Sequence, residues 1–264
     1  MKRTYPTEFI YQMAALLLAF ILVHAFYVTV VRPEAQRFLE QEAANMQADP
    51  LYVQQSSFFV VIKDYEQEAC LVLMLWALAI LGYKGVAAWH QQRLLDQDLL
   101  RLPDSLPIGP EDTRELAERV RSLPVKQHEF LLPRSLLTAI ERFAATRNVQ
   151  DVSTAARDVC ESEGERLESE LSIIRYIAWA IPSVGFIGTV RGIGNALGQA
   201  HRAVEGDITG VTENLGVAFN STFIALVISI VLMFIIHQLQ LMQERLVLDT
   251  ERYVDRAFVR RLKG

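Results

Sequence analysis

The sequence has few cysteines and no excess of positive charge. Its 264 residues include only Cys70 and Cys160, and the formal net charge is −5. Two cysteines in segments that we place in different compartments do not make a secreted disulfide scaffold. A pI near 5.6 gives no support for nucleic-acid binding. These absences remove two broad classes of protein.

Catalytic motifs and strand patterns are also missing. The segments between apolar runs show no alternating strand pattern and no internal repeat. His90 and His128 have no metal-ligand spacing around them. The glycines between 185 and 198 follow no strand, so they are not a nucleotide-binding loop. We therefore expect neither an enzyme nor a protein that needs a metal or a cofactor.

Apolar residues are plentiful and gathered in blocks. They make up 51% of the chain, beside 22% charged residues, and the mean hydropathy is +0.19. A helix that crosses a bilayer needs roughly 20 mostly apolar residues. The first run is about 23 residues long, which is longer than the apolar region of a signal peptide, so we interpret it as a membrane helix that is not cleaved off. Four runs predict transmembrane helices, at 9–31, 69–89, 173–200 and 213–237, the last uncharged from Val217 to Ile236.

Lysine and arginine flank the runs unequally, which predicts an orientation. Both termini and the long segment 90–172 are expected in the cytoplasm, and the tail 238–264 continues the last span as an amphipathic helix. The short cytoplasmic N-terminus covers 1–8, while 32–68 and 201–212 are expected in the periplasm, the former helical. The predicted fold is an all-α integral membrane protein with four transmembrane helices extended by cytoplasmic helices.

Polar residues inside the last two runs form a matched set. Thr189 and Thr222 each lie about 16 residues from the loop between these runs, so both hydroxyls reach a depth of about 25 Å. Asn220 and Ser221 add polarity beside Thr222. A single hydroxyl in a membrane helix can simply bond its own i−4 carbonyl, which we expect of Ser229. The group as a whole favours a polar pathway, because Asn is costly in lipid.

Other residues in the runs suggest packing rather than chemistry. Gly188 to Gly192 and Gly194 to Gly198 are small-xxx-small patterns that permit close helix approach. Arg175 and Arg191 are interpreted as interfacial or salt-bridged residues, and His24 and His237 as inert. No Asp or Glu lies inside the runs 9–31, 69–89 and 173–200 or in the uncharged stretch Val217–Ile236 of the last run, so a conducting protein would need a partner to supply a titratable carboxylate.

Two stretches resemble a known family. Residues 180–193, AIPSVGFIGTVRGI, resemble the Ala-Pro-x-x-Gly-x-x-Gly-Thr-Val-x-Gly-Ile signature of the MotA/TolQ/ExbB proton-channel family, and residues 215–226 resemble its last-span motif. Arg191 departs from the family pattern, and the layout is that of a TolQ/ExbB-like core with an added N-terminal span. The resemblance implies a homo-pentamer around two copies of a single-span MotB-, TolR- or ExbD-like partner that carries an intramembrane Asp.

The resemblance also implies roles for particular residues. Thr189 and Thr222, with Asn220 and Ser221, would line the ion path beside the partner's Asp. Helix packing in the ring would fall to the motif residues Pro182, Gly185, Gly188 and Gly192.

The expected function is an ion-conducting, proton-favouring subunit of a bacterial inner-membrane motor that turns ion-motive force into mechanical work. The alternative is a non-conducting membrane scaffold or sensor with a periplasmic binding segment. A substrate carrier is disfavoured, because broken helices and inverted repeats are missing.

Overall fold

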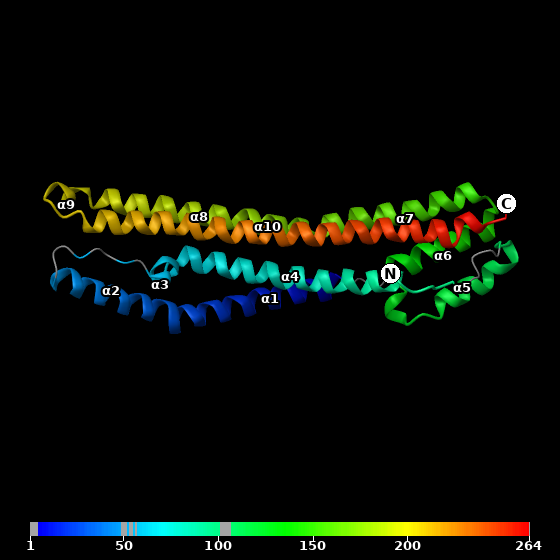
Figure 1. Cartoon of the computed structure of the whole chain (residues 1–264), viewed down its shortest axis with the longest axis horizontal. Helices are drawn as coiled ribbons and strands as arrows, with labels where there is room; N and C mark the ends of the chain where they lie inside the picture. The colour runs from blue at the N-terminus through cyan, green and yellow to red at the C-terminus, as the bar shows by residue number, and fades with distance from the viewer. Residues whose placement is uncertain (1–4, 49–51, 53–54, 56, 101–106, 264) are drawn as a thin grey trace. The chain divides into compact units, whose positions relative to one another are not determined.

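The chain is helical throughout the part that the structure describes. This computed structural model describes residues 5–48, 52, 55, 57–100 and 107–263. Every regular element in these residues is a helix (Figure 1), and Ile108 and Leu262 add a single parallel bridge. The α-helices are α1 Tyr5–Phe26, α2 Arg32–Ala48, α3 Phe58–Ile62, α4 Tyr65–Leu95, α5 Thr113–Arg121, α6 Leu131–Thr146, α7 Val149–Glu170, α8 Ser172–Gly198, α9 Ala200–Val204 and α10 Thr209–Ala257.

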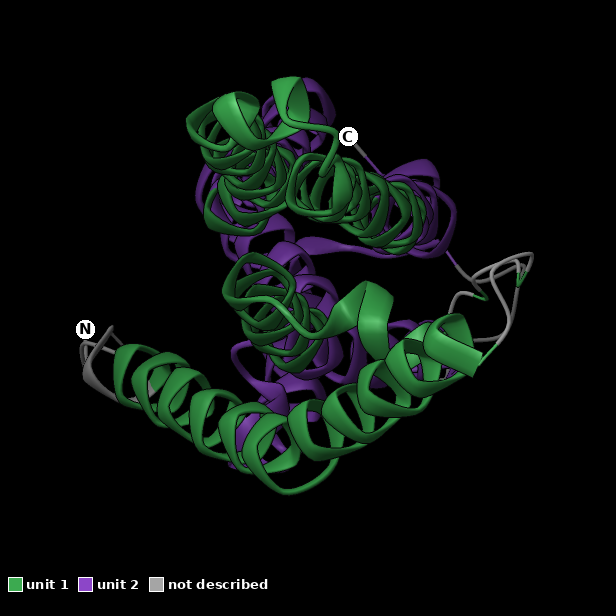
Figure 2. Ribbon diagram, turned by 90° about the vertical axis from the view of Figure 1, so that its left-hand side faces the viewer, with its two compact units in different colours: residues 1–81, 173–236 green, residues 82–172, 237–264 purple. Residues whose placement is uncertain are grey.

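The chain divides into two compact units (Figure 2). Unit 1 comprises residues 1–81 and 173–236, and unit 2 comprises residues 82–172 and 237–264. The long helices α4 and α10 have residues in both units. Each predicted transmembrane run falls in unit 1 for most or all of its length.

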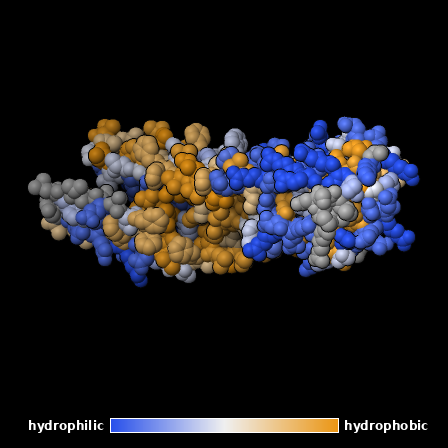
Figure 3. Space-filling model, turned by 45° about the vertical axis from the view of Figure 1, so that its right-hand side comes forward, coloured by the Kyte–Doolittle hydropathy of each residue, from blue (hydrophilic) through white to orange (hydrophobic). Residues whose placement is uncertain are grey.

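Four helical stretches are long and apolar enough to cross a membrane, Glu8–Ala48, Tyr65–Leu95, Val149–Gly198 and Thr209–Arg261. Each contains one of the four predicted runs. Large apolar side chains such as Phe9, Leu17 and Ile230 are more than 60% exposed on these helices. Orange apolar surface of this kind dominates one part of Figure 3, while blue hydrophilic surface dominates the other. The protein is a multi-pass membrane protein, since lipid is the solvent that such a surface needs.

The first helix continues past its apolar run. The sequence suggests a new helix starting at Pro33, but α1 leads through the π-helical turn Tyr27–Val31 directly into α2. In this turn the Arg32 N–H bonds to Tyr27 O, five residues back. Proline has no N–H and clashes with the carbonyl four residues before it, and the wider π turn just ahead accommodates both effects. Burial of Tyr27 and Val31 then fixes the turn against Ile62 and Val72.

Unit 2 has an apolar core of the kind found in soluble proteins. Helices α5, α6 and α7 and the last turns of α10 contribute to it. Phe143 and Phe258 are fully buried and meet edge to face with ring centroids 6.3 Å apart. Backbone hydrogen bonds of 2.8 and 3.1 Å hold Ile108 between Arg261 and Lys263.

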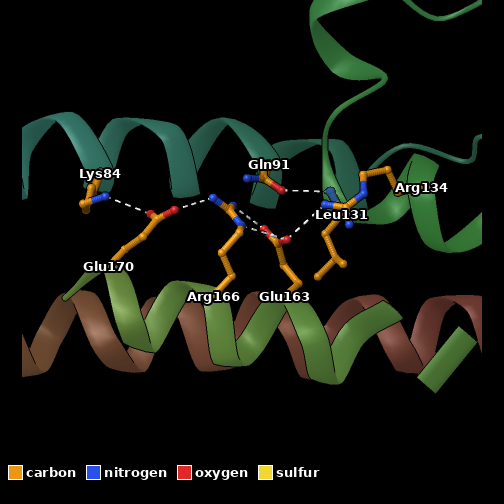
Figure 4. A network of polar contacts seen from close by, with 7 residues as sticks. All are labelled: Lys84, Gln91, Leu131, Arg134, Glu163, Arg166 and Glu170. Atoms are coloured by element: carbon orange, nitrogen blue, oxygen red, sulfur yellow. Dashed lines mark hydrogen bonds and ion pairs between the residues drawn. The ribbon is translucent and has the colours of Figure 1, made fainter. Parts of the chain in front are cut away.

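A network of charged side chains lies beside this core (Figure 4). Lys84 of α4 bonds to Glu170 at 2.8 Å, and Glu170 also pairs with Arg166. Arg166 and Arg134 both bind Glu163, which is 3% exposed, at 2.5 and 3.0 Å. Burial disfavours the charged form of Glu163, but the two arginines outweigh it and lower the pKa of this carboxyl. The network joins α4, α6 and α7.

Candidate ion pathway between α8 and α10

Glycines bring α8 and α10 into backbone contact within unit 1. A Cβ atom at Gly188 would lie 2.6 Å from Ser221 Oγ, and one at Gly192 would lie 2.7 Å from Asn214 O and 2.8 Å from Ala218 N. At Gly185 the added atom would meet Ser221 O at 3.0 Å. Distances below about 3 Å are too short for real contacts, so no other residue fits at Gly188 or Gly192 without a shift in the helices. The sequence prediction that these glycines serve helix packing is therefore consistent with this contact.

The small-residue patterns differ in their contacts within the chain. Gly185, Gly188 and Gly192 pack against α10 of the same chain, and their role in the packing of a ring stays a prediction. The second small-residue pattern does not pack within unit 1, because a Cβ at Gly194 or Gly198 would meet nothing within 4 Å. Sequence spacing identifies both patterns but cannot tell which helix faces them.

The two threonines meet across this contact, as their matched depth suggests. Their hydroxyl oxygens are hydrogen-bonded to each other. Thr189 reaches Ala218 O at 3.0 Å, and Thr222 reaches Gly185 O at 3.3 Å. Ala218 stands four residues before Thr222, and Gly185 stands four residues before Thr189, so each hydroxyl reaches the carbonyl that the other would bond in isolation. Each hydroxyl has one proton and more than one acceptor, so the protons can exchange positions within the pair.

The neighbouring polar residues of α10 differ in their contacts. Ser221 is 1% exposed, donates to Val217 O at 2.8 Å and accepts from Gln67 Nε2 at 3.4 Å. Asn220 is half-buried, and within the described residues no hydrogen bond joins it to the threonine pair. Among the four predicted pathway residues, a hydrogen bond joins Thr189 and Thr222, whereas Ser221 bonds Val217 O and Gln67.

Ser229 has a role that the sequence did not reveal, and Pro182 explains it. Proline lacks the N–H that would bond the carbonyl of Ala178, four residues earlier in α8. Ser229 of α10 donates to that same carbonyl at 3.1 Å. The expectation that Ser229 bonds its own i−4 carbonyl is wrong, because the freed Ala178 carbonyl is the stronger acceptor. Ser183 shows the local pattern instead, donating to Trp179 O at 3.2 Å.

Charged residues at the start of α4 were missed by the sequence reasoning. Arg191 of α8 binds Glu66 with two nitrogens, each 2.8 Å from a carboxylate oxygen, which is the salt-bridge alternative expected for this arginine. Glu68 binds Arg32 and also lies 2.7 Å from His24 Nδ1, so His24 is a hydrogen-bond partner of Glu68. The signal for these contacts was the run of polar residues 63–68 directly before an apolar helix.

Within the described residues, no group of three His, Cys, Asp or Glu side chains could hold a metal ion. Unit 1 is a membrane helix bundle with a partly buried hydroxyl pair between two closely packed helices. Polar groups inside an apolar helix bundle are a feature of membrane proteins that pass ions or polar solutes.

The particular family follows from comparison with known proteins. The chain carries a MotA/TolQ/ExbB proton channel family domain in residues 128–252. This range contains both resembling stretches, all of α7 and α8, and both threonines. The family consists of channels and not enzymes, as the sequence predicted. Searches of curated proteins and of solved structures found no significant match.

Proposed function

We propose that this chain is the ion-conducting subunit of a motor in a bacterial inner membrane, which converts ion-motive force, most simply a proton gradient, into mechanical work. One observation carries the proposal: the hydrogen-bonded pair of Thr189 and Thr222, partly buried between two membrane helices of a channel-family domain. With Ser221 and Asn220 beside it, the pair offers hydroxyl and amide groups that hold or pass a proton where lipid offers none.

A partner subunit is part of the proposal. No Asp or Glu lies inside the first three apolar runs of this chain or between Val217 and Ile236 in the fourth, and a proton path across a membrane normally uses a titratable carboxylate. Proteins of the matched family typically work with MotB, TolR or ExbD. We infer a pentamer of this chain around two copies of a single-span partner whose membrane helix carries an Asp.

The proposed topology places both termini in the cytoplasm. The bias of Lys and Arg toward the segments 1–8, 90–172 and 238–264 supports it. A membrane-impermeant thiol reagent should label a Met46→Cys variant in intact cells, and should label Val125→Cys only after permeabilisation. Both side chains are exposed, and both native cysteines are buried. The reverse labelling pattern would overturn the arrangement.

The function is tested with the complex itself. The chain should be purified together with a single-span, Asp-bearing protein encoded beside it, weighed by native mass spectrometry, and reconstituted into vesicles under a pH gradient. We expect five copies to two and a dissipation of the gradient that needs both subunits. A stable complex without flux would favour the alternative, a scaffold or sensor.

A further inference from the structure

The first turn of α4 lies against the threonine-bearing helices, although the sequence analysis placed it outside the ion path. A Cβ atom at Gly188 of α8 would lie 3.1 Å from Glu66 Cγ and 2.6 Å from Ser221 Oγ. Glu66 of α4 and Ser221 of α10 therefore meet over the same glycine. Gly188 directly precedes Thr189, so a carboxylate lies beside the proposed pathway.

Glu66 is bound by an arginine on both carboxylate oxygens and is slightly exposed. Arg191 binds both of its carboxylate oxygens at 2.8 Å, while the arginine side chain is 41% exposed and that of Glu66 is 11% exposed. Asp64 lies 3.9 Å from the same guanidinium. Burial raises the pKa of the Asp64 carboxyl above its ordinary value. The negative charges of Glu66 and Glu213 raise this pKa further, while the positive charges of Lys63 and Arg191 oppose the shift. A charged cluster thus borders the end of the path where α4 begins.

Gln67 supplies an independent sign of a missing ligand. It is 0% exposed, and its Nε2 donates to Val61 O at 3.1 Å and to Ser221 Oγ at 3.4 Å. Within the described residues, its buried Oε1 has no hydrogen-bond partner. Exchanging the amide oxygen and nitrogen would not help, because the oxygen would then face the Val61 carbonyl. A buried amide oxygen without a hydrogen-bond partner is unfavourable, so a water molecule or a cation is expected there.

We propose that Glu66 and Gln67, in the first turn of α4, belong to the ion pathway, with Glu66 as a carboxylate supplied by this chain and Gln67 Oε1 as an oxygen ligand for the ion between Glu66 and the Thr189–Thr222 pair. This inference rests on the proposed function. The ligand is a small monovalent cation, either a proton carried by water or a sodium ion, because both bind carboxylate and carbonyl oxygens. The pathway then draws on three helices of the chain.

Flux measurements on the reconstituted complex test the proposal. Glu66→Gln and Gln67→Leu should each lower ion flux about tenfold while leaving the amount of assembled complex unchanged. Glu68→Gln is the matched control, since Glu68 is on the same helix and is also bound, but by Arg32 and His24 instead of residues of α8 or α10. It should keep full flux. Equal flux in the wild type, Glu66→Gln and Gln67→Leu would overturn the proposal.

Two further arms make the result decisive. Gln67→Met keeps the length of the side chain and removes its carbonyl, so it should assemble and still lose flux. If no Gln67 variant assembles, the residue serves packing and the proposal is wrong. Gradients of pH without sodium, and of sodium at constant pH, identify the ion. If Thr222→Val loses flux while Glu66→Gln and Gln67→Leu keep it, the proposed function stands and the role of Glu66 and Gln67 is rejected.

Discussion

Polar groups are satisfied in different ways between α8 and α10 of unit 1 and in the charge network of unit 2. In unit 1, hydroxyls donate to backbone carbonyls of a neighbouring helix, as Thr189, Thr222 and Ser229 all do. In unit 2, charged side chains pair with one another, as Glu163 does with Arg166 and Arg134. A neutral hydroxyl costs little to bury once it has an acceptor, while charges are easily kept where part of each partner reaches water. The solvent around each region therefore explains whether hydroxyl–carbonyl bonds or pairs of charged side chains are used.

The units also differ in what packs their helices. Unit 1 uses glycine and alanine, with Ala218 and Ala225 fully buried against the glycines of α8. Unit 2 uses large side chains, including Phe143 and Phe258. Lipid tails are as apolar as leucine, so burying large apolar groups adds little inside a membrane, and close backbone contact matters more. Small residues therefore hold the part of the chain that carries the polar pathway.

Enlarging a glycine of unit 1 should have the largest effect on stability. Gly192→Val places atoms on Asn214 O and Ala218 N, which belong to the backbone and cannot move aside. We expect a loss of about 3 kcal/mol or more and little folded protein after extraction, measured as the monodisperse fraction. Gly194→Val is the control, because a Cβ there meets nothing within 4 Å. Equal yields of the two variants would contradict close packing of α8 on α10.

Neutralising Glu163 tests the charge network of unit 2. Glu163→Gln should lower stability at pH 7 by about 2 kcal/mol, because two charge-assisted hydrogen bonds are weakened. The pKa of this carboxyl is lowered on folding, so its contribution is complete above the ordinary value of 4.5 and fades as the pH falls through the lowered value. Thermal unfolding at several pH values should show the difference shrinking below pH 4.5.

The exposed Glu161 provides the comparison for that experiment. Glu161→Gln should change the melting temperature little at any pH. A pH-independent gap between wild type and Glu163→Gln would show that packing, and not charge, explains the effect.

A smaller effect is expected at Ser229. Ser229→Ala leaves the Ala178 carbonyl without a donor in the helix that Pro182 interrupts, and should cost about 1 kcal/mol. Ser183→Ala, next to the same proline, removes only a bond to its own helix and should be nearly neutral. Melting temperatures in one detergent compare the two. Matching shifts would mean that Ser229 does not compensate for the proline.

Periodicity and composition were sufficient for the four apolar helices, and spacing alone brought Thr189 and Thr222 to one depth. The sequence did not predict which residues of a neighbouring helix the polar side chains contact. Ser229 could have bonded its own helix, and the choice depended on which face of α8 carried the carbonyl freed by Pro182. Glu66 and Gln67 were assigned to the periplasmic helical segment 32–68, because hydropathy marks where an apolar run starts and not what the residues just before it contact.

The central claim is that the hydroxyl pair of unit 1 conducts, and the double variant Thr189→Val, Thr222→Val tests it most directly. Valine keeps the shape of threonine and removes the hydroxyl, so the α8–α10 contact should survive. In vesicles that hold the complex with its Asp-bearing partner, we expect normal assembly and flux at least tenfold below the wild type. Normal flux through an assembled double variant would contradict the account.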